Sequence, residues 1–305
     1  RELIGDEDFK NRNRKTEKMF TRLRSLPFAV VLTMVLRKSV KSLQCIVNET
    51  MHGLCLEEVT ASAYSQARYK LKHTAFIELN QKAIIDVLYQ DEDFKKFWGK
   101  RILAIDGSKI RLPNTQEICD TFGTIAYSQG LDSDVQGEHA YALGSVLFDV
   151  LNRVAIDATL APANAYEVDL AIAHLAHTQR DDLLLMDRNY PSYRMLAMLR
   201  KTERDFAIRC SASSFSVARR MLKGDGTDSQ IVTLTPCAEQ MPMIRALGLP
   251  ETLTVRFVRV LLSTGEFEVM VTSLLDEAGY PSDDFLTLYG LRWGIETFYG
   301  LIKTR

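Results

Sequence analysis

The sequence lacks most of the features that would place it in a special class of protein. Its 305 residues include five cysteines, which are scattered and never stand in a C-x2-C spacing, so neither a zinc site nor a disulfide framework is indicated. The longest apolar run, residues 28–36, is too short to span a bilayer. The formal net charge is only -1, and 46% of the residues are hydrophobic. We therefore expect a globular chain of about two domains in a reducing cytoplasm, without a membrane partner.

One strongly basic segment contrasts with this even charge balance. Residues 9–24 contain seven Lys or Arg and a single Glu, and such a run can bind phosphates. The more common meaning of a charge run near a chain end is a solvated helix face or a mobile arm. The basic residues are Lys10, Arg12, Arg14, Lys15, Lys18, Arg22 and Arg24.

Hydrophobic spacing divides the chain into a helical part and an α/β part. Residues 1–98 have apolar positions three and four apart, which predicts an all-helical N-terminal domain, with Thr60 among the N-cap candidates. The basic run is the part of this domain that would contact the phosphates of DNA. From Arg101 the order β-β-β-α-β-α-β is typical of a mixed sheet. We expect the α/β core at 99–210 and 276–305, with a β-rich insertion at 211–275.

Two aspartates stand where short apolar strands are expected to end. Asp106 closes RILAID, and Asp187 closes DLLLMD. Sheets of this type place their chemistry at strand ends. Many strands also end in Asp because the following turn favours it, so each aspartate taken alone is more often structural.

A single closing helix is expected from Asp283-Asp284 to the chain end, and it includes YGLRWGIETFYGLIK. At about 100° per residue, its polar residues share one stripe about 60° wide, opposite an apolar face. The stripe consists of Tyr289, Arg292, Glu296 and Lys303, and the apolar face of Leu288, Leu291, Ile295, Phe298 and Ile302. An ordinary amphipathic helix with an Arg292–Glu296 pair explains the same spacing. Trp293 lies at the edge of the stripe and is expected to pack rather than to stack on a base.

Three carboxylates from two strand ends and a helix can converge on two Mg²⁺ ions, since Mg²⁺ prefers oxygen ligands. Such a metal pair activates a water or a sugar hydroxyl in phosphoryl transfer. Arg292 and Lys303 would then hold the phosphates of a highly negative substrate.

The segments LAIDGSKIRLP and LLLMDRNYPSY, together with the spacing Y-x2-R-x3-E-x6-K, resemble the bacterial DDE transposases of the insertion-sequence 4 class. TASAYSQARYKLKHTAFIEL is similar to the N-terminal region of that family, so the likeness covers most of the chain. The resemblance implies a ribonuclease H-like catalytic domain with a β-rich insertion. It also implies a protein that works as a homodimer on double-stranded DNA, at the terminal inverted repeats of a transposon and at target DNA.

The same resemblance assigns roles to individual residues. Asp106, Asp187 and Glu296 would be the catalytic, metal-binding triad for two Mg²⁺, which Mn²⁺ can replace. The implied DNA contacts are Tyr289, Arg292, Lys303, Arg188 and Trp293. The implied chemistry is metal-dependent hydrolysis that frees a 3′-hydroxyl, followed by attack of this hydroxyl on a target phosphodiester.

The sequence departs from the family at two points. Some relatives stack a flipped base on a Trp of the insertion, whereas here Phe215, Phe257 or Phe267 would have to take that part. The chain also ends two residues after Lys303, where relatives continue. A truncated, catalytically silent DNA-binding regulator therefore remains an alternative, as does a host nuclease with a ribonuclease H-like fold.

Other acidic residues and histidines are expected to be structural. His174 and His177 stand three apart on a predicted helix without a third ligand nearby, which favours packing or surface positions. Asp132, Asp134 and Glu138 lie in a Gly-containing stretch that predicts a loop.

Overall fold

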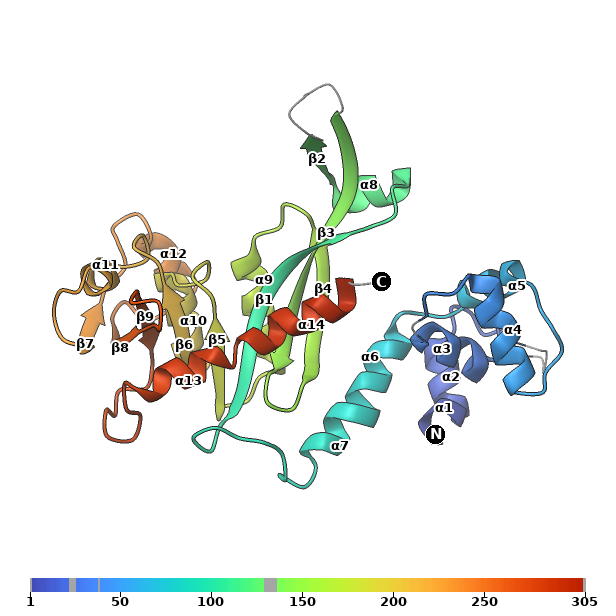
Figure 1. Cartoon of the computed structure of the whole chain (residues 1–305), viewed down its shortest axis with the longest axis horizontal. Coiled ribbons are helices and arrows are strands. Elements are labelled where there is room, and N and C mark those ends of the chain that lie inside the picture. Colours follow the sequence, from blue (N-terminus) through green and yellow to red (C-terminus); the bar gives the residue numbers. More distant parts are fainter. Residues whose placement is uncertain (1, 22–25, 38, 129–135, 304–305) are drawn as a thin grey trace. The chain divides into compact units, whose positions relative to one another are not determined.

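The computed structural model describes residues 2–21, 26–37, 39–128 and 136–303, and Figure 1 shows their helices and strands. The chain forms two compact units that divide between Phe94 and Lys95. Each unit has a hydrophobic core of its own. Among the described residues, no helix combines the length and the apolar character that a membrane span requires.

Helices dominate the described part of the first unit. They are α1 (Glu2–Gly5), α2 (Glu7–Asn13), α3 (Phe28–Leu36), α4 (Leu43–Gly53), α5 (Ala61–Arg68), α6 (Thr74–Asn80) and α7 (Asp86–Tyr89), with a π-helical turn at Gln81–Ile85. The predicted cap of α5 is confirmed, because the Thr60 hydroxyl accepts the N–H of Ala63.

The basic run of residues 9–24 is partly engaged within this unit. Arg12 forms an ion pair of 2.6 Å with Glu78, and Lys15 lies over the ring of Tyr69. Arg14 donates a hydrogen bond to the carbonyl of Met19. Arg22 and Arg24 lie outside the described residues.

The second unit is a mixed α/β arrangement with a sheet of nine strands in its described part. The strands are β1 (Arg101–Arg111), β2 (Thr124–Ser128), β3 (Gln136–Asp149), β4 (Val154–Pro162), β5 (Asp182–Met186), β6 (Asp205–Cys210), β7 (Ser229–Leu234), β8 (Leu253–Leu261) and β9 (Phe267–Thr272). The helices are α8 (Gln116–Phe122), α9 (Glu167–His174), α10 (Tyr193–Lys201), α11 (Ser216–Leu222), α12 (Met241–Ala246), α13 (Asp284–Gly290) and α14 (Trp293–Lys303), with a 3₁₀ turn at Leu175–His177.

The strands follow the order β2-β3-β1-β5-β6-β9-β8-β7, and β4 also pairs with β3. The pairs β1–β5 and β5–β6 are parallel, whereas the other pairs are antiparallel. Every residue of β5 is buried, as expected for a strand in the middle of a sheet with both faces covered. The prediction of a mixed sheet is thus confirmed.

The expectation that the first strand ends at Asp106 is wrong. β1 continues to Arg111, because β3 goes on pairing with it up to Arg111 and Tyr141. The parallel pairing with β5, by contrast, stops at Ala104 and Leu185. Asp106 therefore lies just past the end of the parallel ladder, although not at the end of its own strand.

Residues 211–275, the expected β-rich insertion, contain three strands but also two short helices, α11 and α12, which the sequence pattern did not indicate. The three strands extend the central sheet, since β9 pairs antiparallel with β6. β8 and β9 are joined by a hairpin turn at Gly265, where φ is 85° and the N–H bonds to the carbonyl of Leu262.

The expectation of one closing helix is also wrong. α13 ends at Gly290 and α14 begins at Trp293. Around the break the N–H of Arg292 bonds to the carbonyl of Tyr289, three residues back, so the chain is more tightly wound than an α-helix. Positions on either side of the break therefore do not follow one regular angular series.

Candidate active site

Asp106 and Asp187 occupy matching positions at one edge of the sheet. The last parallel pair is Ala104 with Leu185, and each aspartate stands two residues beyond its member of that pair. The carboxyl ends of parallel strands meet at the same edge, where open α/β sheets bind their ligands. Two carboxylates from distant parts of the sequence are thus brought together.

The charge around Asp106 is only partly compensated. Burial and the charge of Asp187 raise the pKa of Asp106 to about 6, from an ordinary 3.8, and Glu296 acts in the same direction. Arg292 and a hydrogen bond of 2.9 Å from the N–H of Gly107 oppose the rise. Burial is the largest cause of the rise and the charge of Asp187 the next, so Arg292 does not fully compensate the negative charge at this site.

Arg292 lies between Glu296 of helix α14 and Asp106 of strand β1. It is 5% exposed, bonds to Glu296 at 2.6 Å and lies 3.9 Å from the carboxylate of Asp106. The predicted Arg292–Glu296 pair is therefore present, but it belongs to the acidic site rather than to a solvated surface. Glu296 is thereby held within reach of Asp106.

Tyr299 and Lys303 attach the rest of α14 to the same strands. The Tyr299 hydroxyl lies 3.0 Å from the carbonyl oxygen of Asp106 and 2.9 Å from that of Gly144. One turn further on, the ammonium group of Lys303 donates to the hydroxyl of Ser108. The ammonium group of Lys303 is thus placed at a residue of β1 two positions after Asp106.

Tyr289 and Trp293 depart from the predicted stripe because the helix breaks between them. Tyr289 is 4% exposed and packs in the core, where burial raises its pKa to about 12. Trp293, expected to pack, is 59% exposed. Arg292 lies over both rings, 5.4 Å from the centroid of Tyr289 and 5.6 Å from that of Trp293.

A polar cavity of about 390 Å³ opens beside Asp187. Its lining includes the exposed Arg188, the hydroxyl-bearing Ser192, Ser211, Ser213 and Ser214, and the ring of Phe215. Asp187 itself accepts the N–H of Asn189, a further lining residue, at 2.8 Å. Of the three phenylalanines considered for base stacking, Phe215 therefore lies at a cavity, whereas Phe257 is completely buried.

Glu138, His174 and His177, which the sequence predicts to be structural, contact other parts of the fold. Glu138 belongs to strand β3, not to a loop, and accepts the hydroxyl of Thr124. His174 is buried, with ring nitrogens 3.0 Å from Ser145 and 2.7 Å from Asp157, whereas His177 is half-exposed. Asp132 and Asp134 lie outside the described residues.

The sequence reasoning missed three residues beside the predicted triad, namely Glu167, Tyr190 and Tyr299. Burial is the main cause that raises the pKa of Tyr190 and of Tyr299. The charges of Glu167 and Asp106 add to the rise for each of them. A signal was present in the glycine after Asp106, because Gly107 leaves room for a side chain to approach the strand.

The donor set fits a divalent cation in chemistry. Carboxylate oxygens are the ligands that Mg²⁺ takes, and a cation beside Asp106 would offset its burial and the like charge of Asp187, the two main causes of its raised pKa. As the side chains stand, however, no three His, Cys, Asp or Glu residues in the described ranges form a ready metal cluster. Glu296 is turned to Arg292 and would have to leave that ion pair to reach an ion shared with Asp106.

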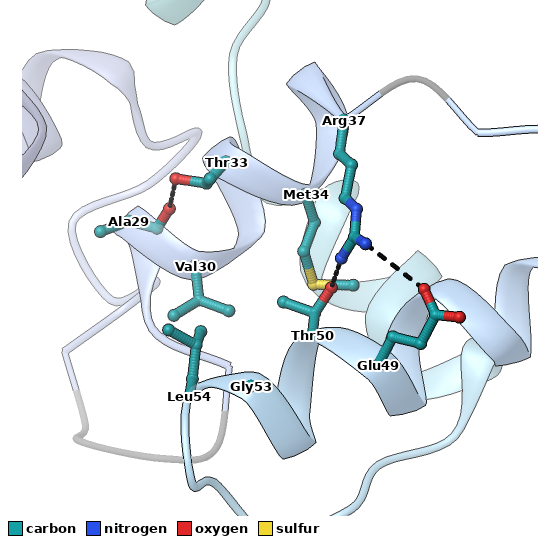
Figure 2. A pocket seen from close by; sticks show the side chains of 9 residues that line it. All are labelled: Ala29, Val30, Thr33, Met34, Arg37, Glu49, Thr50, Gly53 and Leu54. Carbon is teal, nitrogen blue, oxygen red and sulfur yellow. Dashed lines mark hydrogen bonds and ion pairs between the residues drawn. The ribbon is translucent and has the colours of Figure 1, made fainter.

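A second cavity, of about 470 Å³, lies between α3 and α4 of the first unit (Figure 2). Its lining is largely apolar, with Val30, Met34 and Leu54. The guanidinium of Arg37 bonds to Thr50 and to Glu49, each at 3.3 Å. Since this cation is already paired, the cavity offers an apolar surface rather than a second chemical centre.

Two aspartates at the end of a parallel strand pair, faced by a glutamate on a helix, define the class of DDE domains. The family model described as "Transposase DDE domain" matches residues 97–305, and the chain belongs to this family. The family implies a ribonuclease H-like fold, a polynucleotidyl transferase or nuclease, DNA binding and the use of divalent metal ions. A search of the curated proteins finds no match.

Proposed function

We propose that this chain is a DNA transposase of the insertion-sequence 4 class, which cuts the ends of its element and joins the freed 3′-hydroxyl to target DNA. The observation that carries the proposal is the convergence of Asp106, Asp187 and the Arg292–Glu296 pair where the parallel pairing of β1 with β5 stops. The family match supports it over the same residues. In this proposal residues 1–98 are an all-helical domain that contacts DNA, and 211–275 are an insertion into the catalytic core.

Asp106, Asp187 and Glu296 would hold two Mg²⁺ ions, or Mn²⁺ in their place. Bound there, such ions lower the pKa of a water or sugar hydroxyl and stabilise the charge of the leaving oxygen. The protein's own residues position the substrate. Arg292 would release Glu296 and bind a phosphate oxygen instead. Lys303, whose ammonium group donates to the hydroxyl of Ser108, would hold a neighbouring phosphate.

The cavity beside Asp187 would receive the DNA strand next to the cleaved phosphodiester. Arg188 is exposed there and has no ion pair with the described residues, so it is available to a phosphate. The serine hydroxyls that line the cavity would donate to phosphate or base oxygens, and Phe215 offers a ring on which a base can stack. Trp293 would lie against DNA through its exposed face, while Tyr289 acts mainly by supporting Arg292.

The protein would act in the bacterial cytoplasm, on the nucleoid, as a homodimer assembled on two element ends. Light scattering of the chain with and without a duplex that carries the inverted repeats tests the dimer. A monomer in both samples would exclude this assembly.

The test of the chemistry is nicking of DNA taken from the two flanks of the gene. Asp106→Asn, Asp187→Asn and Glu296→Gln should each abolish Mg²⁺-dependent nicking and leave binding in a gel shift nearly unchanged. Asp181→Asn is the matched control, since this exposed residue precedes β5 at its opposite end. Cleavage retained by the three variants would contradict the assignment. Binding without nicking by the unaltered chain would favour the silent regulator, and equal cleavage of RNA or unrelated DNA would favour a host nuclease.

A further inference from the structure

Helix α9 places a fourth carboxylate against the strand that carries Asp106. The helix is fixed to the sheet by the buried Val168, Ala171 and His174, and the His174 ring lies between Ser145 of β3 and Asp157 of β4. Residues three, four and seven apart share one helix face. Glu167, seven residues before His174, is therefore also directed at the sheet.

Glu167 reaches β1 at Gly107. A Cβ atom at Gly107 would stand 3.0 Å from Cδ and 3.1 Å from Oε1 of Glu167, closer than ordinary packing allows. Because successive side chains of a strand point to opposite faces, Glu167 approaches from the face opposite to Asp106. β5 ends at Met186 while β1 continues, so groups from both faces can meet beside β1.

Asp187 lies near both Asp106 and Glu167. Its charge contributes, after burial, to raising the pKa of Asp106 and also that of Glu167. Glu167 makes no hydrogen bond or ion pair with the residues that the structure describes, so both carboxylate oxygens remain available.

Tyr190 is an independent sign that the group of carboxylates takes a ligand. Its side chain is 1% exposed, and its hydroxyl has no hydrogen-bond partner within the described part of the chain. Its N–H bonds to the carbonyl of Asp187 at 3.3 Å, and after burial the charges of Glu167, Asp106 and Asp187 are the main influences that raise its pKa, so the hydroxyl lies near these three carboxylates. A buried hydroxyl without a partner costs on the order of 1–3 kcal/mol. Such a donor indicates that an acceptor enters with the ligand.

We propose that Glu167 is a further metal-binding carboxylate of this site, and that Tyr190 donates a hydrogen bond to a water or carboxylate oxygen on the same ion. This inference rests on the proposed function, because it assumes a cation at Asp106 and Asp187. It enlarges the expected triad to four carboxylates, with α9 as a second helix that supplies a ligand.

The test is Mn²⁺ binding by the full chain, followed through the electron paramagnetic resonance signal of the free ion. Glu167→Gln should weaken the binding of at least one Mn²⁺ by about tenfold or more. Asp169→Asn, a charge loss in the same first turn of α9 at an exposed position, is the matched control and should bind as the unaltered chain does. Tyr190→Phe, which removes only the hydroxyl, should weaken binding to a smaller degree.

A thermal unfolding measurement without metal separates a ligand from a structural residue. Removing one of several repelling charges should leave the unfolding temperature of Glu167→Gln unchanged or raise it. Unchanged Mn²⁺ affinity, or weaker binding together with a lowered unfolding temperature, would overturn the inference. If Asp106→Asn and Asp187→Asn abolish Mn²⁺ binding while Glu167→Gln does not affect it, only this inference fails. If those two variants also bind Mn²⁺ normally, the proposed function fails with it.

Discussion

Replacing Asp106 by Asn should stabilise the metal-free protein at neutral pH. The folded-state pKa of about 6 lies above the ordinary 3.8, so folding favours the protonated form of this carboxyl. This group's contribution to stability is therefore fully present below about pH 4 and is lost as the pH rises to about 6. A shift of about two pK units corresponds to about 3 kcal/mol, which is the upper limit of the expected gain at pH 7.5. Asn keeps an acceptor for the N–H of Gly107 while it removes the charge.

Urea unfolding in EDTA measures this gain, with tryptophan fluorescence as the signal. Trp98 and Trp293 are the two tryptophans of the sequence, and both belong to the second unit, so the signal follows the unit that contains the site. The difference between Asp106→Asn and the unaltered chain should be large at pH 7.5 and close to zero at pH 3.5. Glu117→Gln, at an exposed position of α8, should show no such difference. An Asn variant that is equally stable or less stable at pH 7.5 would refute the reasoning.

Three further outcomes are expected. Arg101→Met should lower the free energy of unfolding by about 3–5 kcal/mol, measured in urea, because it leaves Asp182 buried without the two 2.7 Å bonds it now accepts. Arg292→Gln should reduce Mg²⁺-dependent nicking by at least about tenfold, while circular dichroism remains unchanged, since it removes a cation from the place of the phosphates. Removing divalent ions with EDTA should stop nicking, and adding Mn²⁺ should restore it, as followed on the same duplex.

The positions of the two aspartates could be predicted from the sequence because a buried parallel strand appears as a short run of apolar residues that ends at a polar one. Residues 183–186, LLLM, are apolar throughout, and the polar residue that follows them must lie at the sheet's edge. The extent of β1 could not be predicted in the same way. Its second half is held by pairing with β3, whose residues are 30 to 40 positions away in the sequence and contribute no local signal.

The angular argument for the closing helix was right for Arg292, Glu296 and Lys303 and wrong for Tyr289. A helical wheel assumes one uninterrupted helix, and the tight turns at Leu291 and Arg292 change the phase between α13 and α14. Tyr289 is thereby directed into the core, where tertiary packing covers it. Glu167 was missed for a different reason. An acidic residue in the first turn of a helix is fully explained by the helix dipole, so local sequence gives no reason to look further.

The Tyr299 hydroxyl determines where Glu296 lies along the sheet. It bonds at the junction of two strands, between carbonyl oxygens of β1 and β3, and Glu296 stands three residues earlier on the same helix. A slip of α14 by a single residue would rotate it by about 100° and shift it by about 1.5 Å. Such a slip would separate the hydroxyl from both carbonyls and turn the glutamate away from Asp106. The register of this helix is thus encoded by a residue that takes no part in the chemistry.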